Sequence, residues 1–194
     1  MNTQHPEQPE PGSGSGSGSG SGAGIPPLAP VVADRPEQPY VSFRASVRMD
    51  HFAVIADRLG ELIGWALARG GEFAGAPFFR FRTVDLTGES DVEAGIPLVE
   101  PLTPDGDVRA GTLPAGRYVT VVHTGHPDRL FDTITELRVW ADREGLAWDM
   151  TPLEGGAERW GCRLESYLTD PRVEPDMEKW EIELAFRLTD PPPA

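Results

Sequence analysis

The chain has 194 residues, with 31 Asp and Glu against 17 Lys and Arg, so its formal net charge is −14. This length allows one domain and a tail. Because proteins bind phosphate backbones chiefly through basic patches, the acidity argues against nucleic acid as a direct partner. The single cysteine, Cys162, excludes an intramolecular disulfide and a multi-cysteine metal site, and it fits a reducing compartment, so we expect a cytoplasmic protein. No apolar run approaches the roughly 20 residues of a membrane span, so we expect no membrane partner.

The N-terminal segment, residues 1–37, is predicted to be a disordered tail. A stretch rich in Gln, Glu and Pro precedes a near-perfect Gly-Ser alternation over residues 12–24, and Ile25-Pro26-Pro27 follows. Such a composition cannot bury enough apolar area to offset the entropy lost on ordering. We interpret the tail as a linker without a function of its own or as a tether to a partner, and we place the folded domain at residues 38–190.

The first half of this domain begins with a predicted strand. Apolar and polar residues alternate from Val41 to Met49, the period of a half-buried strand. Asp50 is expected to cap a helix that continues to Ala66, because apolar residues then recur at spacings of three and four until Gly70-Gly71. Two further strands are expected over residues 77–86 and 91–98.

The second half repeats this order. Residues 117–123 predict a strand by their β-branched content, residues 127–144 predict a helix that Gly145 ends, and residues 157–169 and 180–188 predict two further strands. Trp65 lies five residues before Gly70, and Trp140 lies five before Gly145. These matches indicate an internal duplication of a β-α-β-β unit.

The duplication predicts an α+β fold, in which a curved antiparallel sheet carries two helices on one face and leaves the other face as a ligand groove. In the last strand Ile182, Leu184 and Phe186 are expected to meet the helices. Glu183 then lies on the open face, near the middle of its strand. Glu93, its partner in the first half, is expected to be solvated.

Five short motifs carry a resemblance to a known family over residues from about 38 to 190. They are Gly75-Ala76-Pro77-Phe78, Val92-Glu93-Ala94-Gly95-Ile96-Pro97, Leu113-Pro114-Ala115-Gly116-Arg117-Tyr118, Tyr167-Leu168-Thr169-Asp170-Pro171 and Trp180-Glu181-Ile182-Glu183-Leu184. With them the chain resembles the GyrI-like small-molecule-binding domains, whose duplicated fold is of the SHS2 type and which also serve as effector domains of AraC-type and multidrug-sensing regulators.

The resemblance implies that the chain binds bulky, often aromatic or cationic compounds, with Glu183 matching the family's ligand-facing glutamate. Relatives that regulate transcription carry a DNA-binding module. This chain has only the Gly-Ser tail in that place, so the resemblance implies a stand-alone member. Phe81 stands where relatives commonly carry Tyr, which removes a hydroxyl group from the expected site.

The candidate ligand-binding residues are Glu183, at the floor of the groove, and the aromatic residues Phe79, Phe81, Trp160 and Tyr167. Aromatic rings around a carboxylate would attract a delocalised cation. Two plainer interpretations stay open: Glu183 as an ordinary surface carboxylate, and the four rings as residues of the core.

The leading hypothesis for function is a module that senses or sequesters hydrophobic molecules. One alternative is a hydrolase of reactive cyclopropane-containing natural products, in which Glu183 activates water while Trp160 or Tyr167 holds the substrate. Another is a protein that contacts gyrase. His123 and His126 have a metal-like spacing without a third ligand, so we expect no metal; we also expect no cofactor, and we expect Cys162 to be a packed residue.

Overall fold

An eight-stranded antiparallel sheet forms the centre of the protein in the computed structural model, which describes residues 29–190. In spatial order its strands are β1 (Val31–Arg35), β7 (Gly116–Thr124), β11 (Glu181–Arg187), β10 (Arg163–Tyr167), β3 (Phe78–Phe81), β5 (Ser90–Pro97), β2 (Gln38–Val47) and β6 (Arg109–Leu113). A second sheet of three strands contains β4 (Thr83–Val84), β9 (Glu158–Trp160) and β8 (Met150–Pro152). The helices are α1 (Ala53–Ala56), α2 (Leu59–Leu67) and α3 (Leu130–Arg143), with short 3-10 turns η1 (Met49–His51), η2 (Pro127–Arg129), η3 (Glu154–Gly156) and η4 (Met177–Lys179).

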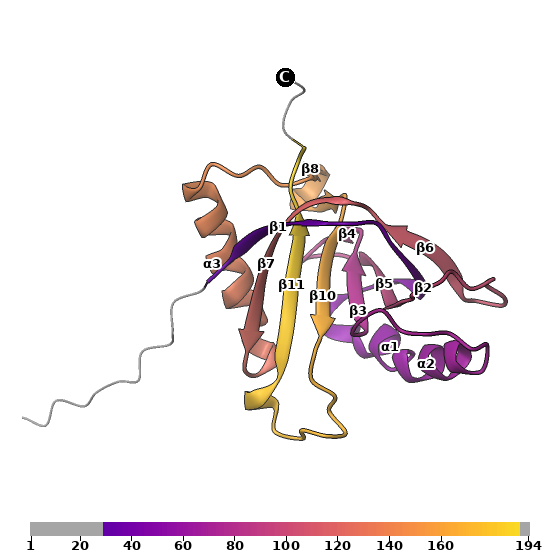
Figure 1. Cartoon of the computed structure of the whole chain (residues 1–194). Coiled ribbons are helices and arrows are strands. Elements are labelled where there is room, and N and C mark those ends of the chain that lie inside the picture. The colour runs from indigo at the N-terminus through magenta and orange to yellow at the C-terminus, as the bar shows by residue number, and fades with distance from the viewer. Residues whose placement is uncertain (1–28, 191–194) are drawn as a thin grey trace, which may run out of the picture.

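The duplicated α+β fold predicted from the sequence is confirmed. The first half contributes β2, α1, α2, β3 and β5, and the second contributes β7, α3, β10 and β11. The halves meet where β3 pairs with β10, and Phe79 opposite Glu165 is the central pair of that register. Figure 1 shows α3 beside β7 and the α1–α2 segment beside the β2–β5 end of the sheet.

Two strands of the main sheet were not expected, and each crosses to the other half. β1 directly precedes β2 in the chain but pairs with β7, and β6 precedes β7 but pairs with β2 (Figure 1). β1 lies inside the segment predicted as disordered tail, so the expected boundary at residue 38 is too late. Its residues are mostly exposed and show no alternation, because backbone pairing with β7 holds the strand rather than burial of one face. Residues 1–28 of that tail lie outside the described residues.

The helix expected from Asp50 to Ala66 is broken into η1, α1 and α2. The break follows α1, where the amide of Arg58 donates to the Ile55 carbonyl at 3.2 Å, a tightened turn in which the backbone keeps right-handed helical angles. Asp50 lies within η1 and makes no capping hydrogen bond; its carboxylate instead pairs with Arg48 at 3.2 Å.

The strands predicted over residues 77–86 and 157–169 each divide between the two sheets. β3 and β10 lie in the main sheet, whereas β4 and β9 pair with each other in the small one. The chain bends between β9 and β10 at Gly161, where a Cβ atom would lie 1.8 Å from the Asp149 carboxylate. No helix within residues 29–190 is long and apolar enough to cross a membrane.

The sheet has two buried faces of different character. On the helix face, Ile55 of α1 and Leu137 of α3 belong to the cluster that contains Ile182, Leu184 and Phe186 of β11. Leu62 of α2 belongs to a neighbouring cluster with Val41 and Phe43 of β2 and Ile96 of β5. We call the opposite side the open face. It carries a smaller buried cluster made of Tyr40, Phe78, Leu113, Tyr118, Cys162, Leu164 and Ala185. This cluster buries part of the open face, and a cavity lies beside it.

Candidate ligand-binding site

The open face holds a cavity of about 380 Å³ at the seam between the two halves. Such clefts between pseudo-equivalent units are frequent ligand sites. The first half contributes Phe78 of β3, and the second contributes Tyr118, Leu164, Ser166 and Glu183. The other lining residues are Arg35, Pro36, Gln38, Ala74, Gly75, Ala76, Pro97, Leu113, Pro114 and Leu168. The walls are thus mainly apolar, with one acidic and one basic residue among the lining residues described.

The acidic residue is Glu183, which lies between Ser166 and Val122 in the sheet register. Its carboxylate accepts a hydrogen bond from Nη2 of Arg35 at 2.7 Å, and the two side chains are 26% and 31% exposed, respectively. Arg35 belongs to the edge strand β1. Ion pairs with this much solvent contact stabilise a fold by only about 0–1 kcal/mol. Glu183 is therefore a wall carboxylate in a partly solvated ion pair.

The apolar wall is shaped by a close contact between Phe78 and Gly95. A Cβ atom on Gly95 would lie 2.5 Å from the Phe78 ring, so the glycine allows the ring to lie flat against β5. Across the cavity, the Tyr118 hydroxyl donates to the Pro114 carbonyl at 2.6 Å. Burial raises the pKa of Tyr118, so its phenol stays neutral and serves as a wall rather than as an acid or base.

The four aromatic residues predicted for the site lie on the helix face. Phe79, Phe81 and Trp160 are buried in the core under α1 and α3, and Tyr167 packs against them. The structure therefore does not bring them together with Glu183. Successive residues of a strand point to opposite faces, so Phe78 reaches the cavity while Phe79 cannot. Phe78 could not be predicted from the sequence, because every residue of β3 is buried and no alternation shows which face meets the helices.

A second carboxylate, Glu165, lies among the helix-face aromatics and was also missed. It is 6% exposed and stands opposite Phe79 in the register, and Phe79 meets the Tyr167 ring edge-on at 5.4 Å. Burial raises the pKa of Glu165, against the opposing effect of Arg163, whose Nη2 lies 3.5 Å away. The sequence held a signal for this residue, since Glu165 and Tyr167 share a strand face.

Glu93, the counterpart of Glu183 in the first half, was expected to be solvated, and this is wrong. It is 5% exposed and accepts a hydrogen bond from the Tyr40 hydroxyl at 2.8 Å. Nη1 of Arg80 donates to the same Tyr40 oxygen at 2.9 Å and lies 3.8 Å from Glu93, while Arg82 lies 3.5 Å from Glu93. The side chains of the adjacent strands thus close over this carboxylate.

The remaining candidates from the sequence have structural contacts. Nδ1 of the buried His123 lies 2.7 Å from the Thr133 hydroxyl, and its Nε2 lies 3.2 Å from the His126 carbonyl. Cys162 is fully buried in the open-face cluster, and this burial raises the pKa of its thiol. A buried thiol with a raised pKa is a poor nucleophile, so the side chain acts in packing.

Solved structures share this fold. The C-terminal domain of EcmrR matches with a TM-score of 0.66 and 18% identity, over 84% of this chain and 99% of that one. EcmrR in an EcmrR–DNA complex matches with a TM-score of 0.65 and 19% identity, and this chain covers only 58% of that longer chain.

Two further structures are similar at lower scores. SAV2435 bound to tetraphenylphosphonium has a TM-score of 0.55 and 12% identity, over 83% of this chain and 94% of that one. A hydrolase from Listeria innocua has a TM-score of 0.56 and 15% identity, over 82% and 91%. At these identities the likeness shows the fold alone.

A search of curated protein sequences gave no match. Residues 29–188, however, match the model of one protein family, described as the GyrI-like small molecule binding domain. The match begins just before β1 and ends just after β11, so it spans every strand of the main sheet. The chain belongs to the GyrI-like small-molecule-binding domain family.

Proposed function

We propose that this protein binds a bulky apolar cation in the open-face cavity, with Glu183 as the counter-charge. The observation that supports this most is the cavity at the seam, with apolar walls of Phe78, Tyr118 and Leu164 and one wall carboxylate. A related fold, SAV2435, has been solved with tetraphenylphosphonium, a cation of this class. The ligand's rings would pack on the aromatic wall, and its charge would lie near Glu183.

Arg35 takes the position that such a cation would need. Its guanidinium is paired with Glu183 at 2.7 Å and stands 5.7 Å from the centroid of the Tyr118 ring. The side chain is partly solvated on an edge strand, so it can turn into water when a ligand enters. Binding would then exchange one cation for another at the same carboxylate, and no charge would be left buried alone.

The test is isothermal titration with tetraphenylphosphonium and with triphenylphosphine oxide as a neutral probe of related shape. Glu183→Gln should weaken binding of the cation by about 1.5–3 kcal/mol, a factor of about 10–150, and should leave the affinity for the neutral probe nearly unchanged. Arg35→Gln removes the competing cation and should strengthen tetraphenylphosphonium binding by up to about 5-fold. No binding of either probe at up to about 1 mM would contradict the proposal.

Two matched variants locate the site. Glu181→Gln changes an exposed carboxylate on the same face near the start of β11, so its effect should be smaller than that of Glu183→Gln. Glu165→Gln changes the carboxylate among the helix-face aromatics. If Glu165→Gln weakens binding of the cation and Glu183→Gln does not, the ligand binds on the helix face and our placement is wrong.

Hydrolysis is the second candidate function. A structure of similar fold from Listeria innocua is described as a hydrolase, and here a carboxylate stands on the wall of a cavity opposite Ser166. Once Arg35 has moved away, Glu183 would act as a base toward water. Mass spectrometry of a reactive cyclopropane-containing compound, incubated with substoichiometric protein, distinguishes the two functions. Several product molecules per protein molecule indicate an enzyme, and unchanged compound indicates a binding module.

A further inference from the structure

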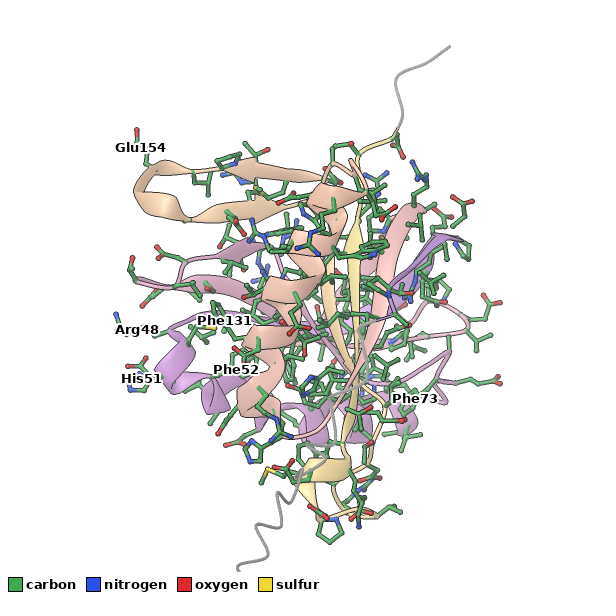
Figure 2. The ribbon with its side chains drawn as sticks, turned by 90° about the vertical axis from the view of Figure 1, so that its left-hand side faces the viewer. Arg48, His51, Phe52, Phe73, Phe131 and Glu154 are labelled. Carbon is green, nitrogen blue, oxygen red and sulfur yellow. The ribbon has the colours of Figure 1, made fainter. Side chains whose placement is uncertain are left out.

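A second, smaller cavity of about 160 Å³ lies away from the open face, between α3 and the small sheet. Its apolar walls include Val84 of β4 and Phe131 and Ile134 of α3, and Arg138, Glu158 and Arg163 supply charge. Phe131 is 59% exposed on the surface of α3, while the loop that carries Glu154 projects from the small sheet (Figure 2). A cavity of about 150 Å³ holds one benzene molecule, so this one accommodates a single ring.

Arg163, in the wall of this cavity, is only 7% exposed and is incompletely paired. Its Nε has no hydrogen-bond partner within residues 29–190. Its Nη2 lies 3.5 Å from a Glu165 oxygen, which is long for a hydrogen bond. A guanidinium carries five donors, and leaving such donors unsatisfied in the interior costs free energy.

Neighbouring groups hold the Arg163 side chain but do not supply the missing acceptor. Its guanidinium carbon lies 5.3, 5.5 and 4.8 Å from the ring centroids of Phe81, Trp160 and Phe186. The nearby carboxylate of Glu158 is engaged elsewhere, because it accepts two hydrogen bonds from Arg138, at 3.1 and 2.7 Å, and one from the Trp160 indole, at 3.1 Å. Stacking fixes the orientation of the guanidinium and leaves donors for a further ligand.

The charge balance around the cavity favours an anion. Arg138 and Glu158 neutralise each other, which leaves Arg163 with Glu165 as its remaining charged partner. Burial raises the pKa of Glu165 and lowers the pKa of Arg163, and the 3.5 Å contact between the two side chains leaves Nε of Arg163 without an acceptor among the described residues. A buried guanidinium pairs strongly with a planar carboxylate, whose two oxygens match its fork of donors.

We propose that this cavity is a second ligand site, which takes a small organic carboxylate with its anionic group on Arg163 and its apolar part against Ile134 and Val84. The site is selective for negative charge, opposite to the charge expected in the open-face cavity. It is entered beside Phe131 and Thr135, both exposed on α3 and both in its wall.

The experiment is isothermal titration of the full chain with benzoate and with benzamide, a neutral molecule of the same shape. Benzoate should bind at least about 10-fold more tightly than benzamide, because only the anion pairs with the guanidinium. Arg163→Met should abolish this preference, and Arg163→Lys should keep part of it. Equal affinity for the two probes, or no benzoate binding at up to about 10 mM, overturns the proposal.

A variant outside the core still tests the proposal if the Arg163 variants fail to fold. Thr135→Phe places a ring at the mouth of the cavity from an exposed helix position and should weaken benzoate at least about 10-fold. Val139→Phe is the matched control, since Val139 is exposed on α3 and is not among the lining residues described. If benzoate binds Thr135→Phe as tightly as Val139→Phe, it binds elsewhere and the proposal is wrong.

Discussion

Glu93 and Glu183 occupy the same position in the two halves of the sheet but have different surroundings. In the register, Glu93 stands opposite Arg80 of β3, and Glu183 stands opposite Ser166 of β10. Arg80 reaches over Glu93 towards the Tyr40 hydroxyl and helps to bury the carboxylate. A serine is too short to do the same for Glu183, so the space above it remains the open-face cavity.

The two tyrosines of the open face correspond in the same way. Tyr40 lies four residues before the partner of Glu93 on β2, and Tyr118 lies four before the partner of Glu183 on β7. Tyr40 hydrogen-bonds its glutamate, whereas Tyr118 donates to the Pro114 carbonyl. One half has thus become a closed polar network that stabilises the fold, and the other keeps its carboxylate within reach of a ligand.

The largest expected effect on stability comes from breaking the closed network. Arg80→Met should lower the free energy of unfolding by about 3 kcal/mol, because it removes the buried arginine that stands opposite the buried Glu93 on β3. Arg35→Met, the matched change beside Glu183, should cost less than about 1 kcal/mol because that pair is partly solvated. Urea denaturation measures both, and similar losses would show that the two halves do not differ as described.

Converting the open half into the closed one should remove ligand binding. Ser166→Arg places an arginine opposite Glu183, as Arg80 is placed opposite Glu93, and should fill the cavity and pair the carboxylate. Tetraphenylphosphonium affinity should fall by about 100-fold or more, near 2.7 kcal/mol. Ser166→Ala is the control and should change the affinity little. Retention of full affinity by a folded Ser166→Arg protein would place the ligand outside this cavity.

The smallest expected effect is a difference in stability between variants of the two tyrosines. Tyr40→Phe removes the hydroxyl that donates to the Glu93 carboxylate and accepts from Arg80, so it should cost about 1.5–3 kcal/mol of unfolding free energy. Tyr118→Phe removes one neutral hydrogen bond to the Pro114 carbonyl and should cost about 0.5–1.5 kcal/mol. Thermal unfolding of the two variants side by side would show this order, and the reverse order would contradict it.

Several features of the fold could be predicted because they depend on local patterns. The alternation of Ile182, Leu184 and Phe186 placed these side chains towards the helices, and the structure buries all three there. The equal spacing of Trp65 from Gly70 and of Trp140 from Gly145 indicated the duplication, which the strand order confirms. β1 could not be predicted in this way, because its exposed residues carry no pattern and its partner β7 is 85 residues later in the chain.

The sequence by itself determined the duplicated α+β fold and the face of the last strand on which Glu183 lies, because large apolar residues alternate with Glu183 in that strand and mark its core side. Only the tertiary structure decided which residues surround that carboxylate. The pairing of β3 with β10 sets Phe78 rather than Phe79 on the open face, and the crossing of β1 brings Arg35 to Glu183. Both depend on contacts between distant segments, whose register is fixed by the packing of the whole sheet rather than by any local pattern.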